Sequence, residues 1–251
     1  MNTDEELLYK RFIELAQKSD NGYYLFSDFL GLSEQSIFNE AKMKFGKARY
    51  TLFGGDKRTE RVMVRFGDPE EIGYEVPFPI KIVFIEPKSP KFADKLTHRD
   101  FLGAILNLGI ERKAIGDIVI VNNSGYVFVK EDMADYVASS LERIKRTDVK
   151  TSISDSLPDT ELFKTERKTI QLSGERIDAA ISKIYSISRD DSLSLFKKHL
   201  VFVCGKLCEN NSYNPKENDV ISVRGFGRFI YHGPVSTSKK GKLNIEVEIY
   251  V

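Results

Sequence analysis

Apolar positions in the first part of the chain follow a helical period and then change to a strand-like one. Residues 5–18 carry apolar side chains three or four positions apart, at Leu8, Phe12, Leu15 and Ala16. This spacing predicts an amphipathic helix, and a second helix is expected to start after Ser33, its N-terminal cap, and to run to about Lys44. Residues 50–53 and 61–66 are strand-like and flank Gly54-Gly55-Asp56, which predicts a hairpin. We therefore expect residues 1–75 to form an N-terminal helical and β-hairpin subdomain.

The middle of the chain alternates strand and helix patterns. Strand-like runs occupy residues 78–85, 118–121 and 126–129, helical runs occupy 101–108 and 133–144, and one or more strands should follow between 149 and 172. The order βαββαβ is that of the split-βαβ arrangement found in ferredoxin-like and RRM domains. We expect a central RRM-like (ferredoxin-like) α/β sandwich at residues 76–170, although the charged residues 159–169 are also compatible with a linker.

Two aromatic residues on the third predicted central strand are candidates for base stacking. Tyr126 and Phe128 lie two positions apart, so they share one face of the strand. RRM domains place stacking aromatics on this strand, but Ser124 and Val127 depart from the usual pattern. A core or covering role is therefore the competing interpretation. Together with His98 and Arg99, these aromatics make a candidate second surface for RNA or a protein partner.

The last third predicts two short helices with basic flanks, followed by strands. Ile177, Ile181 and Ile184 form an apolar stripe, and Arg176 and Lys183 lie on a shared flank of that helix. Ser188 is the expected cap of the second helix, with Asp191 at the capping-box position. The cations of the second helix are Arg189 at its start and Lys197 and Lys198 at its end. Strands are expected at residues 201–203, 219–224 and 243–250.

The formal net charge of +1 conceals an asymmetry along the chain. Residues 167–251 hold 14 Lys and Arg against 9 Asp and Glu, a net charge of +5, whereas the remainder holds 24 against 28, a net charge of −4. A phosphate backbone would be attracted to the C-terminal third.

Cysteine usage and hydropathy limit the remaining classes of protein. Cys204 and Cys208 are the only cysteines, and with His199 and His232 they match no common zinc pattern. We expect no metal and no other cofactor. No apolar run approaches the ~20 residues that span a bilayer, and the first six residues are acidic. A cytoplasmic protein with no membrane partner is expected.

Several segments of the last third resemble the successive signatures of the S4 RNA-binding domain. They are Arg176-Ile177-Asp178, Ser188-Arg189, Val203-Cys204-Gly205 and Asp219-Val220-Ile221-Ser222-Val223. The chain departs from the usual S4 pattern at His199 and Asn218, where Gly is common, and at Cys204, where Asn is common. The resemblance implies an S4 domain of the αL type at residues 171–251, and an α+β fold for the whole chain.

The central segment resembles the signature of YlmH-type proteins. The matching residues are 91–103, 108–112 and Gly116-Asp117, and residues 223–229 look like that family's version of S4. The resemblance implies a bacterial cytosolic protein that binds structured ribosomal RNA and tRNA without catalysis. It would act as a monomer on the large ribosomal subunit, in the rescue of stalled translation complexes (ribosome-associated quality control), with no DNA partner. The cations expected to contact RNA are Arg176, Lys183, Arg189, Lys197, Lys198, Arg224, Arg228, Lys239 and Lys240.

Two other classes of function remain open at this point. S4 modules are often attached to RNA-modifying enzymes, and Thr97-His98-Arg99-Asp100 invites an acid–base interpretation. However, Ile105 stands where a kinase loop needs Asn, and no phosphate-binding glycine loop precedes it. We expect Thr97 to cap a helix with Asp100 in its first turn, and His98 and Arg99 to face solvent or RNA. The third class is a protein–protein adaptor that docks through the apolar residues 102–109.

Overall fold

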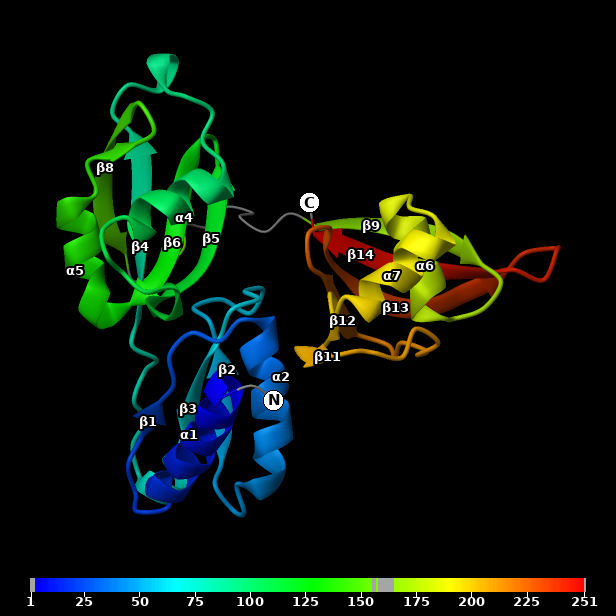
Figure 1. Ribbon diagram of the computed structural model, residues 1–251, viewed down its shortest axis with the longest axis horizontal. Coiled ribbons are helices and arrows are strands. Elements are labelled where there is room, and N and C mark those ends of the chain that lie inside the picture. Colours follow the sequence, from blue (N-terminus) through cyan, green and yellow to red (C-terminus); the bar gives the residue numbers. More distant parts are fainter. Residues whose placement is uncertain (1–2, 155–156, 158–164, 251) are drawn as a thin grey trace. The chain divides into compact units, whose positions relative to one another are not determined.

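The computed structural model describes residues 3–154, 157 and 165–250 of the 251-residue chain. The chain divides into two compact units (Figure 1). The N-terminal unit comprises residues 1–34 and 40–162, and the C-terminal unit comprises residues 35–39 and 163–251. Each unit mixes helices with antiparallel sheet, so the fold class is α+β. Over the described ranges, no helix has the length and apolar character needed to cross a bilayer.

The first part of the N-terminal unit packs helices on a small sheet. Its elements are α1 (Thr3–Ser19), β1 (Leu25–Phe26), η1 (Lys42–Lys44), β2 (Tyr50–Phe53), β3 (Met63–Phe66) and α3 (Pro69–Ile72), together with the two ends of α2 (Leu32–Ala41), whose residues 35–39 belong to the C-terminal unit. The strands are ordered β1-β3-β2, and β2 and β3 form the predicted antiparallel hairpin. The predicted apolar stripe of α1 is confirmed, because Phe12, Leu15 and Ala16 are buried.

The second part of this unit is a five-stranded sheet with helices on one face. Its elements are β4 (Ile80–Pro87), η2 (Pro90–Phe92), α4 (His98–Leu106), η3 (Arg112–Ala114), β5 (Ile115–Val121), β6 (Ser124–Lys130), α5 (Glu131–Ser140), β7 (Arg143–Ile144) and β8 (Thr147–Ser154). The strands are ordered β5-β6-β4-β8-β7, and all neighbours are antiparallel. Side chains from the sheet and from α4 and α5 share one buried core, including Val83, Val127, Phe101 and Val137. The predicted helix over 133–144 is too long, because residues 143 and 144 pair with β8.

A glycine and two charged side chains join the two parts of the N-terminal unit. The Asp117 carboxylate accepts hydrogen bonds from the backbone N–H groups of Glu60 and Arg61. The partly buried Arg61 guanidinium in turn donates to the carbonyls of Phe29 and Ile115. Gly116 lies so close to Phe29 and Phe128 that an added Cβ would stand 2.7 Å from one ring and 2.9 Å from the Phe128 Cβ. The Gly116-Asp117 pair therefore serves packing and backbone pairing between the two parts.

The C-terminal unit is a six-stranded antiparallel sheet with two helices on one face (Figure 1). Its elements are β9 (Thr165–Leu172), α6 (Ile177–Tyr185), α7 (Arg189–Lys197), β10 (Val201–Val203), β11 (Lys206–Leu207), β12 (Asp219–Val223), β13 (Gly227–Thr237) and β14 (Leu243–Tyr250). The strands are ordered β11-β10-β12-β13-β14-β9. Ile177 and Ile181 of α6 share a core with Phe229, Tyr231 and Val247 of the sheet.

Two strands of this sheet differ from the sequence prediction. The predicted strands leave residues 225–242 without a strand, yet residues 227–237 form β13, which pairs on both sides and carries register shifts near Gly233 and Pro234. Residues 165–172 form β9, which pairs along its whole length with β14. Residues 165–170 therefore belong to the C-terminal sheet, although the predicted boundary assigned them to the central domain.

Candidate nucleic-acid interface

Asp178, in the first turn of α6, organises two of the predicted RNA-contacting cations. Its side chain is buried, and its carboxylate accepts hydrogen bonds from Arg176 Nε at 3.1 Å and Arg176 Nη2 at 3.0 Å. Arg189, at the start of α7, donates from Nη2 to the same carboxylate at 2.9 Å. Ser192 Oγ of α7 donates to the Asp178 carbonyl at 2.8 Å. One carboxylate thus holds an arginine from each helix and fixes the two helices to each other.

The arginines of this cluster keep a positive charge directed at solvent. Two guanidinium groups face a single carboxylate, so the cluster carries a net charge of +1. The Arg176 and Arg189 side chains are about half exposed, at 47% and 50%, whereas that of Asp178 is 1% exposed. Hydrogen bonding to Asp178 raises the pKa of Arg176. Because side chains held in place lose little further entropy on binding, this arrangement suits the recognition of phosphate oxygens.

A depression beside this cluster brings further cations together. It has a volume of about 500 Å³, and Lys183 of α6, Arg189 of α7 and Lys242 line it together with Ser182 and Ser186. The sequence prediction named Lys183 and Arg189 among the RNA-contacting cations but did not name Lys242. Lys242 joins this group through the pairing of β14 with β9. Leu243 pairs with Leu172, which places Lys242 beside the end of β9. We call Arg176, Lys183, Arg189 and Lys242 the helical basic face.

Four other predicted cations are exposed but line no described depression. Lys197 ends α7 and Lys198 is its C-cap, about 12 Å along the helix axis from Arg189. Lys239 and Lys240 are exposed in the turn between β13 and β14. These lysines can widen a positive surface, but the structure does not gather them around one point.

Arg228 lies on the other face of the C-terminal sheet. Its neighbour Phe229 points into the core beneath the helices, so strand alternation directs Arg228 away from them. The Arg228 guanidinium stacks on the Tyr250 ring at 3.8 Å, and Glu246 and Glu248 share this face. Arg224, just after β12, stacks on Phe202 at 5.2 Å. The nine predicted cations therefore do not form one surface, and the carboxylates on the face of Arg228 are themselves contacted by Arg167 and His232.

The three departures from the S4 pattern share one backbone property. His199, Cys204 and Asn218 have φ angles of 54°, 48° and 68°, in the left-handed region. Gly adopts this region without a steric penalty and Asn tolerates it. Gly at positions 199 and 218 or Asn at position 204, the residue types common in the S4 pattern, would suit this backbone, which His199 and Cys204 adopt at a steric cost.

The two aromatic residues predicted on the central sheet differ in how deeply they are buried. Phe128 is fully buried. It lies so close to Gly55 and Gly116 that a Cβ added at either position would collide with it. Its predicted role as an exposed stacking residue is wrong, since the first part of the unit covers that end of the sheet. Tyr126 is half-buried and packs against Phe84 of β4, with ring centroids 4.7 Å apart. The sequence prediction missed Phe84, although it is the residue opposite Tyr126 in the β4–β6 register.

The Thr97-His98-Arg99-Asp100 segment caps α4, as predicted. Thr97 N and Oγ1 donate to Asp100 Oδ2 at 2.8 and 2.7 Å. Lys145 Nζ lies 2.7 Å from the same oxygen, and these hydrogen bonds lower the pKa of Asp100 to about 2. Desolvation and nearby Arg112 lower the pKa of His98. The Asp100 carboxylate thus has a structural role, in the helix cap and in the ion pair with Lys145.

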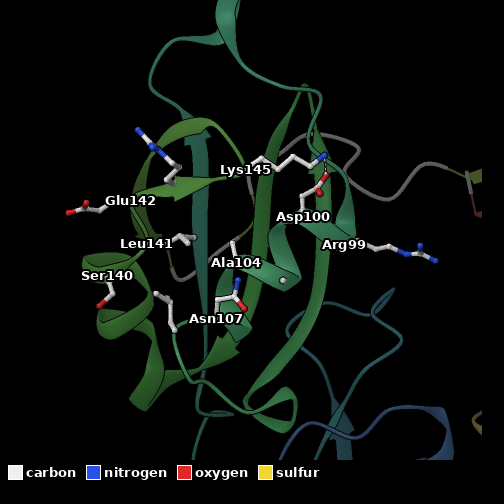
Figure 2. A pocket seen from close by; sticks show the side chains of 11 residues that line it. Arg99, Asp100, Ala104, Asn107, Ser140, Leu141, Glu142 and Lys145 are labelled. Carbon is white, nitrogen blue, oxygen red and sulfur yellow. Dashed lines mark ion pairs between the residues drawn. The ribbon is translucent and has the colours of Figure 1, made fainter.

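A second depression, of about 630 Å³, lies between α4 and the segment from α5 to β7. Figure 2 shows Lys145 and Asp100 directed toward each other at one end of it, while Arg99 extends outward. Of the apolar stretch predicted as a docking face, Ile105 is buried in the core and Leu106 is exposed. Among the described residues, no three His, Cys, Asp or Glu side chains are arranged to hold a metal ion.

Comparison with known proteins gives matches of three kinds. Residues 74–156 match the family model described as "Putative RNA-binding domain in YlmH". The chain is 30% identical over 258 residues to the ribosome-associated protein quality control protein P2 of Bacillus subtilis (strain 168), covering 98% of this chain and 93% of that protein. A structure of the cell division protein ylmH from Streptococcus pneumoniae has 18% identity and a TM-score of 0.49, covering 61% of this chain and 93% of that chain. The match over nearly the full length of both proteins establishes that this chain belongs to the YlmH family.

Proposed function

We propose that the protein binds structured RNA through the helical basic face of an S4-type C-terminal domain. The observation that carries this proposal is the convergence of Arg176 and Arg189 on the buried Asp178, beside Lys183 and Lys242. The cations come from two helices and a turn, and the core below them is well packed. A set of donors gathered in this way suits phosphates that a folded RNA holds at fixed spacing.

The partner that we propose is the ribosome. The relative from Bacillus subtilis is named a ribosome-associated quality control protein. We infer that this chain contacts ribosomal RNA and tRNA on the large subunit, in the cytoplasm, during the rescue of stalled translation complexes. A protein of that kind needs stable positioning on RNA rather than turnover, and we propose that it acts without catalysis.

We further propose that the central part is an RRM-like domain. The strand order β5-β6-β4-β8 and the connections β4-α4-β5-β6-α5-β8 are those of the split-βαβ arrangement. Phe84 and Tyr126 lie on its two central strands, on the face away from α4 and α5. This face is therefore available for a second contact, with either RNA or protein.

Sedimentation with separated ribosomal subunits tests the proposal. The informative variant is Lys183→Gln/Lys242→Gln, because both side chains are exposed and neither supports Asp178. The matched control is Lys10→Gln/Arg11→Gln, which removes the same charge from α1. We expect the wild type and the control to pellet with the large subunit, and the informative variant to stay largely in the supernatant at moderate salt.

Two results would count against the proposal. Pelleting of the informative variant at the wild-type level would mean that the helical basic face is not the anchor. A wild-type protein that stays in the supernatant with both subunits would refute the ribosomal partner, and a free structured RNA would then be the substrate to test.

A further inference from the structure

The loop between β4 and α4 presents an exposed aromatic ring among lysines. Phe92 is 91% exposed, the largest exposed fraction among the large apolar residues of the described ranges. Lys88, Lys91 and Lys95 are exposed in the same loop. A partner that covers this ring would remove its apolar surface from water, which stabilises a complex.

Hydrogen bonds at its base fix this loop in place. The Asn123 side chain, from the β5–β6 turn, accepts from Leu96 N at 2.7 Å and donates to the Asp94 carbonyl at 2.9 Å. Thr147 Oγ1 accepts from Asp94 N at 2.9 Å. The Asp94 carboxylate accepts from Arg146 Nη2 at 3.0 Å. Phe92 therefore stands on a scaffold built by two neighbouring turns, rather than on a freely moving segment.

The charge around Phe92 favours a polyanion. Asp94 and Asp100 are the acidic residues of segment 88–100, and each is paired with a cation, Arg146 and Lys145 respectively. Asp148, which Lys88 approaches, is paired with Arg143, and among the described residues no ion pair engages Lys91 or Lys95. Aromatic rings that alternate with cations are the arrangement by which proteins stack on bases while holding the adjoining phosphates.

We propose that Phe92 stacks on an unpaired base of the bound RNA, while Lys88, Lys91 and Lys95 contact the neighbouring phosphates. This inference rests on the proposed RNA-binding function but concerns a different surface from the helical basic face. A single aromatic ring gives little apolar area for a lipid bilayer or an apolar protein groove, and a base needs only one ring. The site would distinguish unpaired nucleotides from a continuous duplex.

The absence of tryptophan from the chain permits a direct test. Phe92→Trp introduces the sole indole at the proposed contact, and Leu7→Trp introduces one on α1 beside Asp4, Glu5 and Glu6 as the control. Each full-length variant is titrated with deproteinised large-subunit ribosomal RNA, with a perfect RNA duplex and with anionic phosphatidylglycerol vesicles. We expect the ribosomal RNA to quench the indole at position 92 strongly, and to leave the indole at position 7 unchanged.

Affinity measurements with Phe92→Tyr and Phe92→Leu complete the test. The tyrosine variant keeps the ring and should bind ribosomal RNA like the wild type, whereas the leucine variant should bind about tenfold more weakly. Binding of ribosomal RNA without quenching at position 92, equal quenching by the duplex, or a blue shift caused only by the vesicles would overturn the inference. If ribosomal RNA does not bind to any variant or to the wild type, the proposed function itself fails, which is a distinct outcome.

Discussion

At the residue scale, the Asp178 carboxylate has both a structural and an electrostatic role. A buried carboxylate is costly unless charged partners compensate it, and here Arg176 and Arg189 supply that compensation. The sequence indicated the cations of the two helices, because their spacing and caps are local properties. It could not reveal that both arginines share one carboxylate, since that depends on the packing of α6 against α7.

Removing both arginines of the cluster should cost more than the sum of the single changes. Arg176→Ala or Arg189→Ala leaves Asp178 with one cation, whereas the double variant buries an uncompensated charge. We expect a coupling free energy of about 1 to 3 kcal/mol in denaturant unfolding. Adding Asp178→Asn to the double variant should recover part of the loss. Strictly additive effects would show that the carboxylate does not depend on the two arginines jointly.

The left-handed backbone at His199 gives a second prediction. His199→Gly relieves the steric cost of a φ of 54°, whereas His199→Ala removes the same side chain and keeps that cost. The glycine variant should therefore be more stable than the alanine variant by about 1 kcal/mol. Thermal unfolding of the two variants measures the difference, and equal melting temperatures would argue against the left-handed conformation.

At the element scale, local signals account for most of the helices and strands. The apolar stripes of α1 and α6 and the caps of α4 and α7 follow from short-range sequence patterns. β13 was missed because Gly225 and Gly227 suggested a turn, and because Gly233-Pro234 interrupts the alternation of Phe229 and Tyr231. Its pairing with β12 and β14 overrides those local signals. The burial of Phe128 was not predicted for a related reason. The backbone that packs on its ring, at Gly55, is distant in sequence.

The Asp100 cap of α4 should make stability depend on acidic pH. The folded-state pKa of about 2 is below the ordinary value of 3.8, so the charged form stabilises the folded state. This contribution is complete above about pH 5 and is lost as the pH falls toward 2. Asp100→Asn should therefore lower the unfolding free energy at pH 6 and lower it less at pH 3. Asp135→Asn, exposed on α5, is the control, and a difference that stays constant with pH would contradict this account.

At the scale of the whole molecule, the surfaces that we propose for nucleic acid lie on separate units. The C-terminal unit offers the helical basic face, and the N-terminal unit offers the Phe92 loop and the Phe84–Tyr126 pair. The sequence predicted the α+β class and the family, because both rest on patterns that lie within single segments. It did not predict how segments far apart complete each surface, such as Lys242 beside Lys183 or Asn123 beneath the Phe92 loop.

The salt dependence of RNA affinity tests the central claim most directly. The dissociation constant for deproteinised large-subunit ribosomal RNA is measured at several salt concentrations for the wild type, for Lys183→Gln/Lys242→Gln and for the control Lys10→Gln/Arg11→Gln. Each lost phosphate contact lowers the slope of log affinity against log salt by about 1. We predict a slope shallower by about 2 for the first variant and an unchanged slope for the control. A wild-type slope and affinity in the Lys183→Gln/Lys242→Gln variant would contradict the claim that the helical basic face holds RNA.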